Sequence, residues 1–227
     1  MSVWVTGDTH GMYDDLIERI SENNVKENDS IIVTGDFGFV SGRPERREAF
    51  LSLMRENYRF WFIDGNAEEY PFLETFRVEL WSSGNARIIT PNIVHLMRGE
   101  VYEIECGGRR KTIFCMGGAY SVDRQYRCEG VDWFPQELPS LEAYVRADRA
   151  LEGCRYKVDH IITHTAPPSV AEVLGFSIAE EEYVLSSYLE ELRRRVVFDQ
   201  WFFGHFHTDK RLPSGFTAVH DKMIRIL

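Results

Sequence analysis

The chain has 227 residues, of which 44% are hydrophobic and 27% are charged, a balance typical of a globular α/β domain with its own core. Its 26 Lys and Arg residues face 36 Asp and Glu residues, a net charge of −10, which disfavours a broad nucleic-acid surface because phosphates are repelled. No apolar run reaches the ~18 residues of a membrane span, so no membrane partner is expected.

The chain ends and the cysteines bear on the compartment. Met1–Val5 is followed directly by polar residues, without the basic and long apolar regions of a signal peptide. The four cysteines, none of them in a C-x-x-C pair, are typical of reduced thiols; they are Cys106, Cys115, Cys128 and Cys154. We therefore expect a cytoplasmic protein.

The first third of the chain alternates two kinds of segment. Short apolar runs predict strands at 2–6, 30–34 and 59–63. Apolar residues at helical spacing predict helices at 14–20 and 44–57, the second with a proline near its start. Strands that alternate with helices indicate a parallel sheet covered by helices.

The rest of the chain is richer in strands. Helices are predicted at 140–151 and 179–196. A hairpin turn is predicted at Cys106–Arg109. The predicted strands are 93–96, 100–105, 111–116, 159–163, 200–203 and one or two within 216–227. No linker or repeat interrupts the pattern, so one domain is expected over residues 1–227.

Five polar clusters directly follow predicted strands. They are Gly7–Gly11, Gly35–Asp36, Gly65–Asn66, Thr163–His164 and Gly204–His207. Taken singly, most are more typical of a turn or of a hydrogen-bonded histidine, although alternate strand residues such as His205 and His207 share a face. Because the carboxyl ends of strands in an open α/β sheet meet along one edge, we expect the clusters to converge there.

The five clusters, in this order, resemble the motifs of calcineurin-like metallophosphoesterases. The resemblance spans residues 3–207 and implies a four-layer α/β/β/α sandwich, with two central mixed sheets flanked by helices. It also implies a phosphoric ester hydrolase with two divalent transition-metal ions. In such an enzyme a metal-bridging hydroxide attacks a phosphomonoester or a phosphodiester.

The resemblance assigns seven predicted ligands. The first metal would take Asp8, His10 and His207, the second would take Asn66, His164 and His205, and Asp36 would bridge them. Carboxylate and imidazole ligands suit Mn, Fe, Zn, Ni or Co and fit a calcium site poorly. Two divalent ions outweigh the two carboxylates, so the implied site attracts phosphate within an acidic protein.

Ala67 departs from the family pattern. Members usually carry a histidine directly after the Gly-Asn pair, credited with protonating the leaving group, and a methyl group transfers no proton. Loss of a positioned general acid typically costs about 10²–10⁴-fold in rate. Three interpretations stay open: the leaving group needs no acid; Glu68, His95 or His220 acts instead; or the chain is a catalytically weak metal-binding scaffold or phosphate-ligand binder.

The segment Gly117–Arg127 carries two arginines three residues apart. Arg124 and Arg127 would share a helical face and suit bidentate phosphate contacts, so they are predicted, with Asn66, to bind substrate. The alternative is that both arginines pair with carboxylates. The expected substrate is a small phosphorylated molecule such as a nucleotide, because the stretch Gly35–Val40 lacks the fuller motif of protein phosphatases. The oligomeric state and the choice between monoester and diester stay open.

Overall fold

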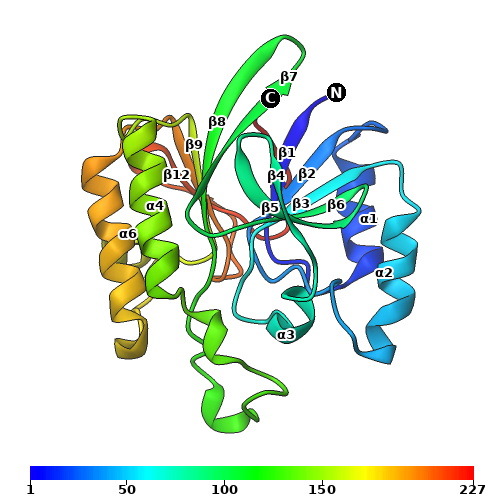
Figure 1. Cartoon of the computed structure of the whole chain (residues 1–227), viewed down its shortest axis with the longest axis horizontal. Helices are drawn as coiled ribbons and strands as arrows, with labels where there is room; N and C mark the ends of the chain where they lie inside the picture. The colour runs from blue at the N-terminus through cyan, green and yellow to red at the C-terminus, as the bar shows by residue number, and fades with distance from the viewer.

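The computed structural model describes all 227 residues as two β-sheets packed face to face, with helices on both outer faces (Figure 1). Helices α1 and α2 cover one sheet, and α4 and α6 cover the other. This arrangement confirms the predicted α/β/β/α sandwich.

The first sheet has seven strands in the order β13-β1-β2-β3-β6-β5-β4. Strands β1, β2, β3 and β6 are parallel, whereas β13, β5 and β4 pair antiparallel. The bounds are β1 Val3–Thr6, β2 Ser30–Val33, β3 Arg59–Phe62, β4 Val78–Trp81, β5 Gly84–Thr90, β6 Ile93–Leu96 and β13 Ile224–Arg225. Because β13 pairs with β1, the end of the chain closes on its beginning.

The second sheet has six strands in the order β11-β12-β10-β9-β8-β7. Strands β12, β10, β9 and β8 are parallel, and the two edge strands are antiparallel. The bounds are β7 Glu100–Cys106, β8 Arg109–Met116, β9 His160–Thr163, β10 Gln200–Phe203, β11 Lys210–Arg211 and β12 Phe216–Ala218. The β7–β8 pair is the predicted hairpin, and it extends beyond the sandwich (Figure 1).

Six α-helices connect the strands. Their bounds are α1 Tyr13–Glu22, α2 Arg47–Met54, α3 Tyr70–Leu73, α4 Leu141–Gly153, α5 Pro168–Leu174 and α6 Tyr183–Arg195. Helix α1 buries Leu16 and Ile20, four residues apart and therefore on one face. A 3₁₀ turn, Pro44–Arg46, precedes α2 and places Arg46 outside the regular helix.

Three apolar cores separate the four layers. The central core joins residues of both sheets, such as Val5 and Ile32 of the first sheet and Ile162 and Phe202 of the second. One outer core lies under α1 and α2, and the other lies under α4, α5 and α6. Strands buried on both faces read as continuous apolar runs, which is why these strands were recognisable from the sequence.

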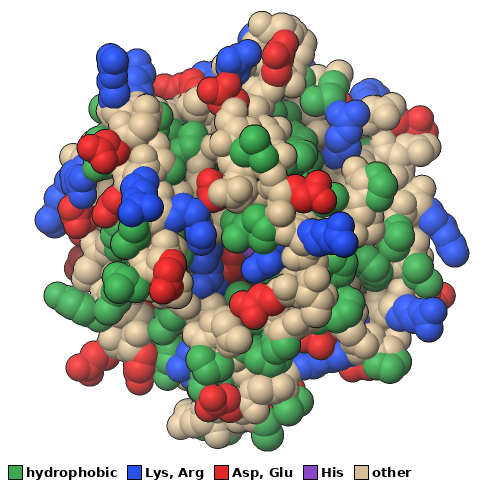
Figure 2. All heavy atoms as spheres, in the orientation of Figure 1, with side chains coloured by type: hydrophobic (Ala, Val, Ile, Leu, Met, Phe, Trp, Pro, Cys, Tyr) green, Lys and Arg blue, Asp and Glu red, His purple; other side chains and the backbone are tan.

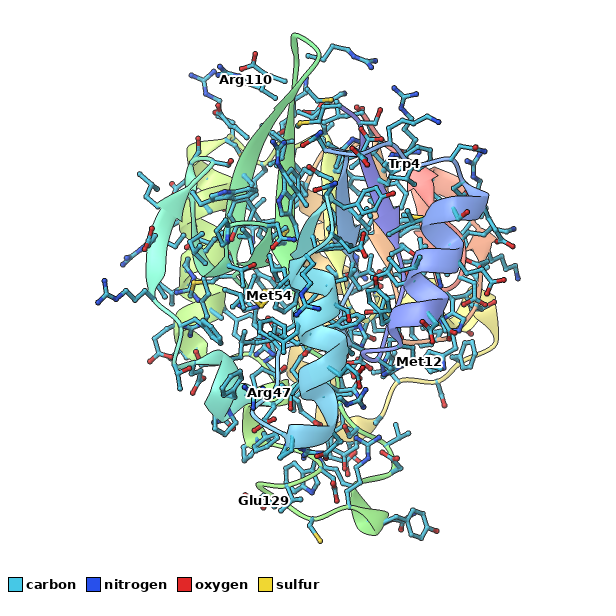
Figure 3. The ribbon with its side chains drawn as sticks, turned by 90° about the vertical axis from the view of Figure 1, so that its right-hand side faces the viewer. Trp4, Met12, Arg47, Met54, Arg110 and Glu129 are labelled. Atoms are coloured by element: carbon cyan, nitrogen blue, oxygen red, sulfur yellow. The ribbon has the colours of Figure 1, made fainter.

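Residues 117–140, between β8 and α4, form a lobe that projects beyond the carboxyl ends of the strands (Figure 1). The lobe contains only two 3₁₀ turns, Arg124–Tyr126 and Pro135–Glu137. A hydrogen bond from the Arg43 guanidinium to the carbonyl of Val131 ties it to the first sheet's loops. In Figure 3, Met12 and Arg47, at the starts of α1 and α2, lie at the same end as Glu129 of the lobe.

The remaining surface is mixed in charge. Figure 2 shows acidic and basic side chains interspersed over one face, with apolar side chains between them. None of the helices has the length and apolar character needed to cross a membrane.

Candidate metal centre

The seven predicted ligands all lie just past the carboxyl ends of strands. Asp8 and His10 follow β1, Asp36 follows β2, and Asn66 follows β3. His164 directly follows β9 in the second sheet, and His205 and His207 follow β10. The site therefore straddles both sheets, and the topology brings together residues that are up to 199 positions apart in the chain.

Asp8, His10 and His207 form a first group. The Nε2 atom of His207 lies 3.1 Å from Oδ2 of Asp8 and 3.1 Å from Nε2 of His10. One donor atom from each residue lies within 4.8 Å of the others. Two imidazole nitrogens and a carboxylate oxygen in this arrangement can bind one cation.

Asn66, His164 and His205 form a second group. Oδ1 of Asn66 lies 3.0 Å from Nε2 of His164 and 3.0 Å from Nδ1 of His205. Asp36 lies between the two groups, with Oδ1 at 3.5 Å from His164 and Oδ2 at 3.9 Å from His10. Asp36 can therefore face two cations at once.

The backbone at this site is strained. Four of the seven predicted ligands have a left-handed backbone although none is glycine: φ is 47° at His10, 49° at Asp36, 65° at His205 and 45° at His207. Each such residue costs on the order of 1–3 kcal/mol and persists only where the surroundings impose it. The backbone strain is therefore concentrated at residues whose side chains converge on the same site.

Motif glycines allow the loops to approach each other. A Cβ atom at Gly65 would collide with the carboxylate of Asp36, and a Cβ atom at Gly204 would collide with that of Asp8. These positions must be glycine because a carboxylate from another loop occupies the space that a side chain would need.

The two carboxylates are buried without a basic partner. Asp8 and Asp36 are 1% and 3% exposed, and their ion-pair contacts are with histidines only, with no Lys or Arg within 4.0 Å. Burial opposes ionisation of Asp8, but the hydrogen bond with His207 and the nearby His164 bring its pKa below the ordinary value. Buried charges require compensation, which two bound cations would supply.

Burial and hydrogen bonding act differently on the two imidazoles of the second group. Burial, reinforced by nearby His164, lowers the pKa of His205 to about 3, so this ring is neutral at neutral pH. His164 donates Nδ1–H to the carbonyl of Thr34 at 2.8 Å, which leaves Nε2 facing Asn66. Burial lowers the pKa of His164, but nearby Asp36 and Asp8 outweigh it and raise the pKa above the ordinary value, so this ring gives up a proton when it binds a metal. The donor set of carboxylate, amide oxygen and neutral imidazole thus fits two divalent transition-metal ions.

The model of the family described as calcineurin-like phosphoesterase matches residues 1–209. The chain belongs to the calcineurin-like phosphoesterase family. The resemblance inferred from the motifs is thereby confirmed, as is its coarse function: the chain is a metal-dependent phosphoric ester hydrolase with a dinuclear divalent metal centre.

Two solved structures are similar to this calcineurin-like phosphoesterase. Phosphopantetheinyl hydrolase (PptH) from Mycobacterium tuberculosis is 15% identical, with a TM-score of 0.52 over 96% of this chain and 89% of that chain, and it supports the fold. The 5′-nucleotidase from Candida albicans SC5314 is 16% identical, with a TM-score of 0.44 over 96% of this chain and 44% of that chain. No match is found among curated proteins.

The lobe of this calcineurin-like phosphoesterase fixes the amide of Asn66, a role that no sequence motif indicated. Nδ2 of Asn66 donates to Oγ of Ser121 at 3.1 Å, and Oγ of Ser121 donates to Oε2 of Glu137 at 2.8 Å. Glu137 is fully buried and is paired with Arg124 at 2.6 Å. Because the ion-paired carboxylate accepts the Ser121 proton, the hydroxyl lone pairs accept from the amide, and Oδ1 of Asn66 faces the histidines.

Arg124 is fully engaged within the lobe. Its guanidinium lies 4.2 Å from the ring centroid of Tyr120 and 4.0 Å from that of Trp133, in addition to its pairing with Glu137. Arg127 pairs with Asp123 at 2.8 Å. These contacts favour the alternative that the sequence left open, in which the arginines pair with carboxylates, although Arg127 also lines a cavity beside the metal centre.

The three alternative acids occupy different places. His95 is buried, and its Nε2 lies 3.0 Å from Oδ1 of Asp64. Glu68 is also buried, and its oxygens accept from the backbone amides of Phe37 and Gly38. His220 is the exception, because its ring stacks on that of His207 with centroids 4.6 Å apart and stays partly exposed.

Replacing Ser121 by alanine tests the amide network. Without the hydroxyl, the Asn66 amide loses its fixed orientation, so we expect metal affinity at the second group to weaken by about 10- to 100-fold. The measurement is calorimetric titration of the metal-free protein with Mn²⁺. The exposed Ser177→Ala variant is the control. Equal affinities in the two variants would show that Ser121 does not position Asn66.

Proposed function

We propose that this chain hydrolyses a small phosphorylated molecule, with its seven predicted ligands holding two divalent metal ions. Asp8, His10 and His207 hold the first ion. Asn66, His164 and His205 hold the second ion, and Asp36 binds both. The observation that carries the proposal is the pair of buried carboxylates, Asp8 and Asp36, ringed by imidazoles and lacking any Lys or Arg partner.

The chain's own residues orient the donors. When bound, the ions supply activation of water and neutralisation of the phosphate oxygens. Thr34 holds the His164 ring through Nδ1, and Ser121 holds the Asn66 amide. Asn66 and Arg127 are proposed to lie against the substrate phosphate, whereas Arg124 is proposed to act through Glu137 as a positioning residue.

We propose further that hydrolysis does not depend on a general acid. By the resemblance of the motifs, Ala67 stands where family members usually carry the acid, and its backbone amide donates to Oδ1 of Asp36 at 2.7 Å. His95 is buried and bonded to Asp64. Burial raises the pKa of Glu68 to about 8, but both of its oxygens are engaged by backbone amides. His220, which stacks on His207, is the alternative acid that this proposal sets aside. A substrate whose leaving group departs as a stable anion therefore suits this site.

The remaining features complete the proposal. The four cysteines are free thiols, which suits a reducing cytoplasm. The pairing of β13 with β1 suits one domain over residues 1–227. Manganese is our first choice among Mn, Fe, Zn, Ni and Co for reconstitution, because the mixed oxygen and nitrogen donor set suits it.

The test is hydrolysis by chelator-treated protein after reconstitution. The metal-free protein is supplied in turn with Mn²⁺, Fe²⁺, Co²⁺, Ni²⁺ or Zn²⁺ and assayed on p-nitrophenyl phosphate and bis-p-nitrophenyl phosphate. We expect turnover that depends on added metal, and the ratio of the two rates sorts monoester from diester activity. Protein that binds metal yet hydrolyses neither ester would be a metal-binding scaffold, and the proposal would fail.

A further inference from the structure

A cavity of about 180 Å³ lies between the first sheet's loops and the lobe. One wall comes from Gly38, Arg43 and Arg46 together with Ala67, and the opposite wall comes from the lobe, including Arg127. We propose that this cavity holds a phosphate leaving group, so that the bond cleaved is a phosphoanhydride. The inference rests on the proposed function and names its substrate class.

The cavity lies next to the metal centre, although none of the seven predicted ligands is in its wall. Ala67, in its wall, donates its backbone amide to Oδ1 of Asp36 at 2.7 Å. Arg46, also in its wall, donates from Nη1 to the carbonyl of His10 at 2.5 Å. Two wall residues are therefore bonded to two of the predicted ligands, and a phosphorus atom at the metal centre can place its leaving group in the cavity.

The carboxylates of the cavity wall already have donors. Glu68 accepts from two backbone amides. Glu69 accepts from the hydroxyl of Ser41 and the amide of Gly42, and lies 3.8 Å from Arg43. Asp132 accepts from the backbone amide of Cys128. None of these carboxylates depends on Arg46.

Arg46 is the cavity's guanidinium without an anionic partner. It is partly buried, and no carboxylate lies within 4.0 Å of it, whereas Arg43 and Arg127 each have one. Its one hydrogen bond, to the His10 carbonyl, uses Nη1 and leaves its other donors available. A guanidinium in this state favours a phosphate oxygen, which it can bind through two parallel hydrogen bonds.

A phosphate leaving group also explains why the enzyme would not need a general acid at position 67, where it has alanine. Phosphate is a weak base that departs as an anion at neutral pH without receiving a proton. Arg46 would stabilise the negative charge that develops on it, as arginine does in other phosphoryl transfers. Because Ala67 lines the cavity, its small side chain leaves room that an imidazole at this position would reduce.

The step balances with water alone. The oxygen of one water forms a bond to the phosphorus at the metal centre, and the bond from that phosphorus to the bridging oxygen breaks. The bridging oxygen keeps the electron pair and leaves as part of the second phosphate. The protons of the water pass to solvent or to the two product phosphates, and no oxidant or further reactant is needed.

The experiment compares Arg46→Gln with Arg47→Gln in the metal-loaded enzyme. Arg47 is the exposed neighbour and lies outside the cavity, so it is a matched control for lost charge. The phosphoanhydride substrates are inorganic pyrophosphate and ADP, and the reference substrate is p-nitrophenyl phosphate. Its leaving group, p-nitrophenolate, is about as weak a base as phosphate but has no phosphate oxygens for Arg46 to bind. We expect Arg46→Gln, and not Arg47→Gln, to lower the ratio of kcat/KM for pyrophosphate to that for p-nitrophenyl phosphate by about 10- to 100-fold.

A binding measurement and a second variant guard against misfolding. Calorimetric titration of the metal-loaded proteins with methylenediphosphonate, which is not hydrolysed, should give a weaker Kd in Arg46→Gln and in Arg127→Gln than in Arg47→Gln. An unchanged Kd in both cavity variants would overturn the inference.

The two proposals fail in different ways. Turnover of p-nitrophenyl phosphate without turnover of pyrophosphate or ADP would overturn the phosphoanhydride inference and leave the esterase intact. If the enzyme hydrolysed none of p-nitrophenyl phosphate, bis-p-nitrophenyl phosphate, pyrophosphate and ADP, the proposed function itself would be overturned.

Discussion

Replacing Asp36 by asparagine is expected to lower kcat/KM on p-nitrophenyl phosphate by at least about 10³-fold, because the shared charge is worth several kcal/mol at a two-metal site. Asp36 faces both groups, at 3.5 Å from His164 and 3.9 Å from His10. In a calorimetric titration with Mn²⁺, the metal-free variant should also lack the tighter of the two binding events of the unmodified protein.

The control for this substitution is Asp15→Asn, which makes the same change of charge on the exposed face of α1. It should keep both the rate and the metal stoichiometry of the unmodified protein. If Asp36→Asn bound two Mn²⁺ ions with unchanged affinity, Asp36 would not be the shared ligand, and the assignment of both groups would need revision.

Replacing Ala67 by histidine is expected to accelerate hydrolysis of alkyl phosphates, whose leaving groups need a proton, by about 10²-fold or more. The backbone amide of Ala67 is bonded to Asp36, and Ala67 lines the cavity beside the metal centre, so we expect an imidazole there to reach the departing oxygen. The same ring should slow pyrophosphate hydrolysis, because it takes up space in a cavity of about 180 Å³. Rates are measured over a series of leaving groups of rising pKa.

Ala67→Gln separates the two effects, since glutamine takes up space without transferring protons. This variant should slow pyrophosphate hydrolysis, and it should hydrolyse alkyl phosphates no faster than the unmodified protein does. If the histidine variant gave no gain on alkyl phosphates and the same dependence on leaving-group pKa as the parent, the general acid would have to be elsewhere, and His220, stacked on His207, would be the first residue to replace.

The sequence was sufficient for the central strands and for the convergence of the five clusters. Strands such as β2 and β10 are buried almost throughout, so they read as apolar runs, and the geometry of parallel sheets then brings their carboxyl ends together. Strand β4 was missed because Val78–Trp81 is largely exposed and carries no continuous apolar run. Helix α5 was missed because seven residues give too few turns for a periodic signal.

The network around Asn66 could not be predicted from the sequence. Ser121 lies 55 residues from Asn66 and 16 from Glu137, in a lobe with little regular structure, and neither residue stands in a recognisable motif. The proposed role of Arg46 could not be predicted from the sequence either, since a charged residue at the start of a helix is ordinarily solvated. Its lack of a carboxylate partner is a property of the packed structure.

The contacts between motif glycines and acidic ligands couple the motifs to one another. Gly65 of one loop contacts Asp36 of another, and Gly204 contacts Asp8, so a side chain added in one motif displaces a donor in a different motif. Divergence within such a site must proceed by paired changes, and a ligand grafted from a relative will function only with the loop that faces it. Ala67 differs, because it lines a cavity and its bond to Asp36 comes from the backbone amide, which every residue except proline keeps. Its side chain can therefore change without loss of that bond.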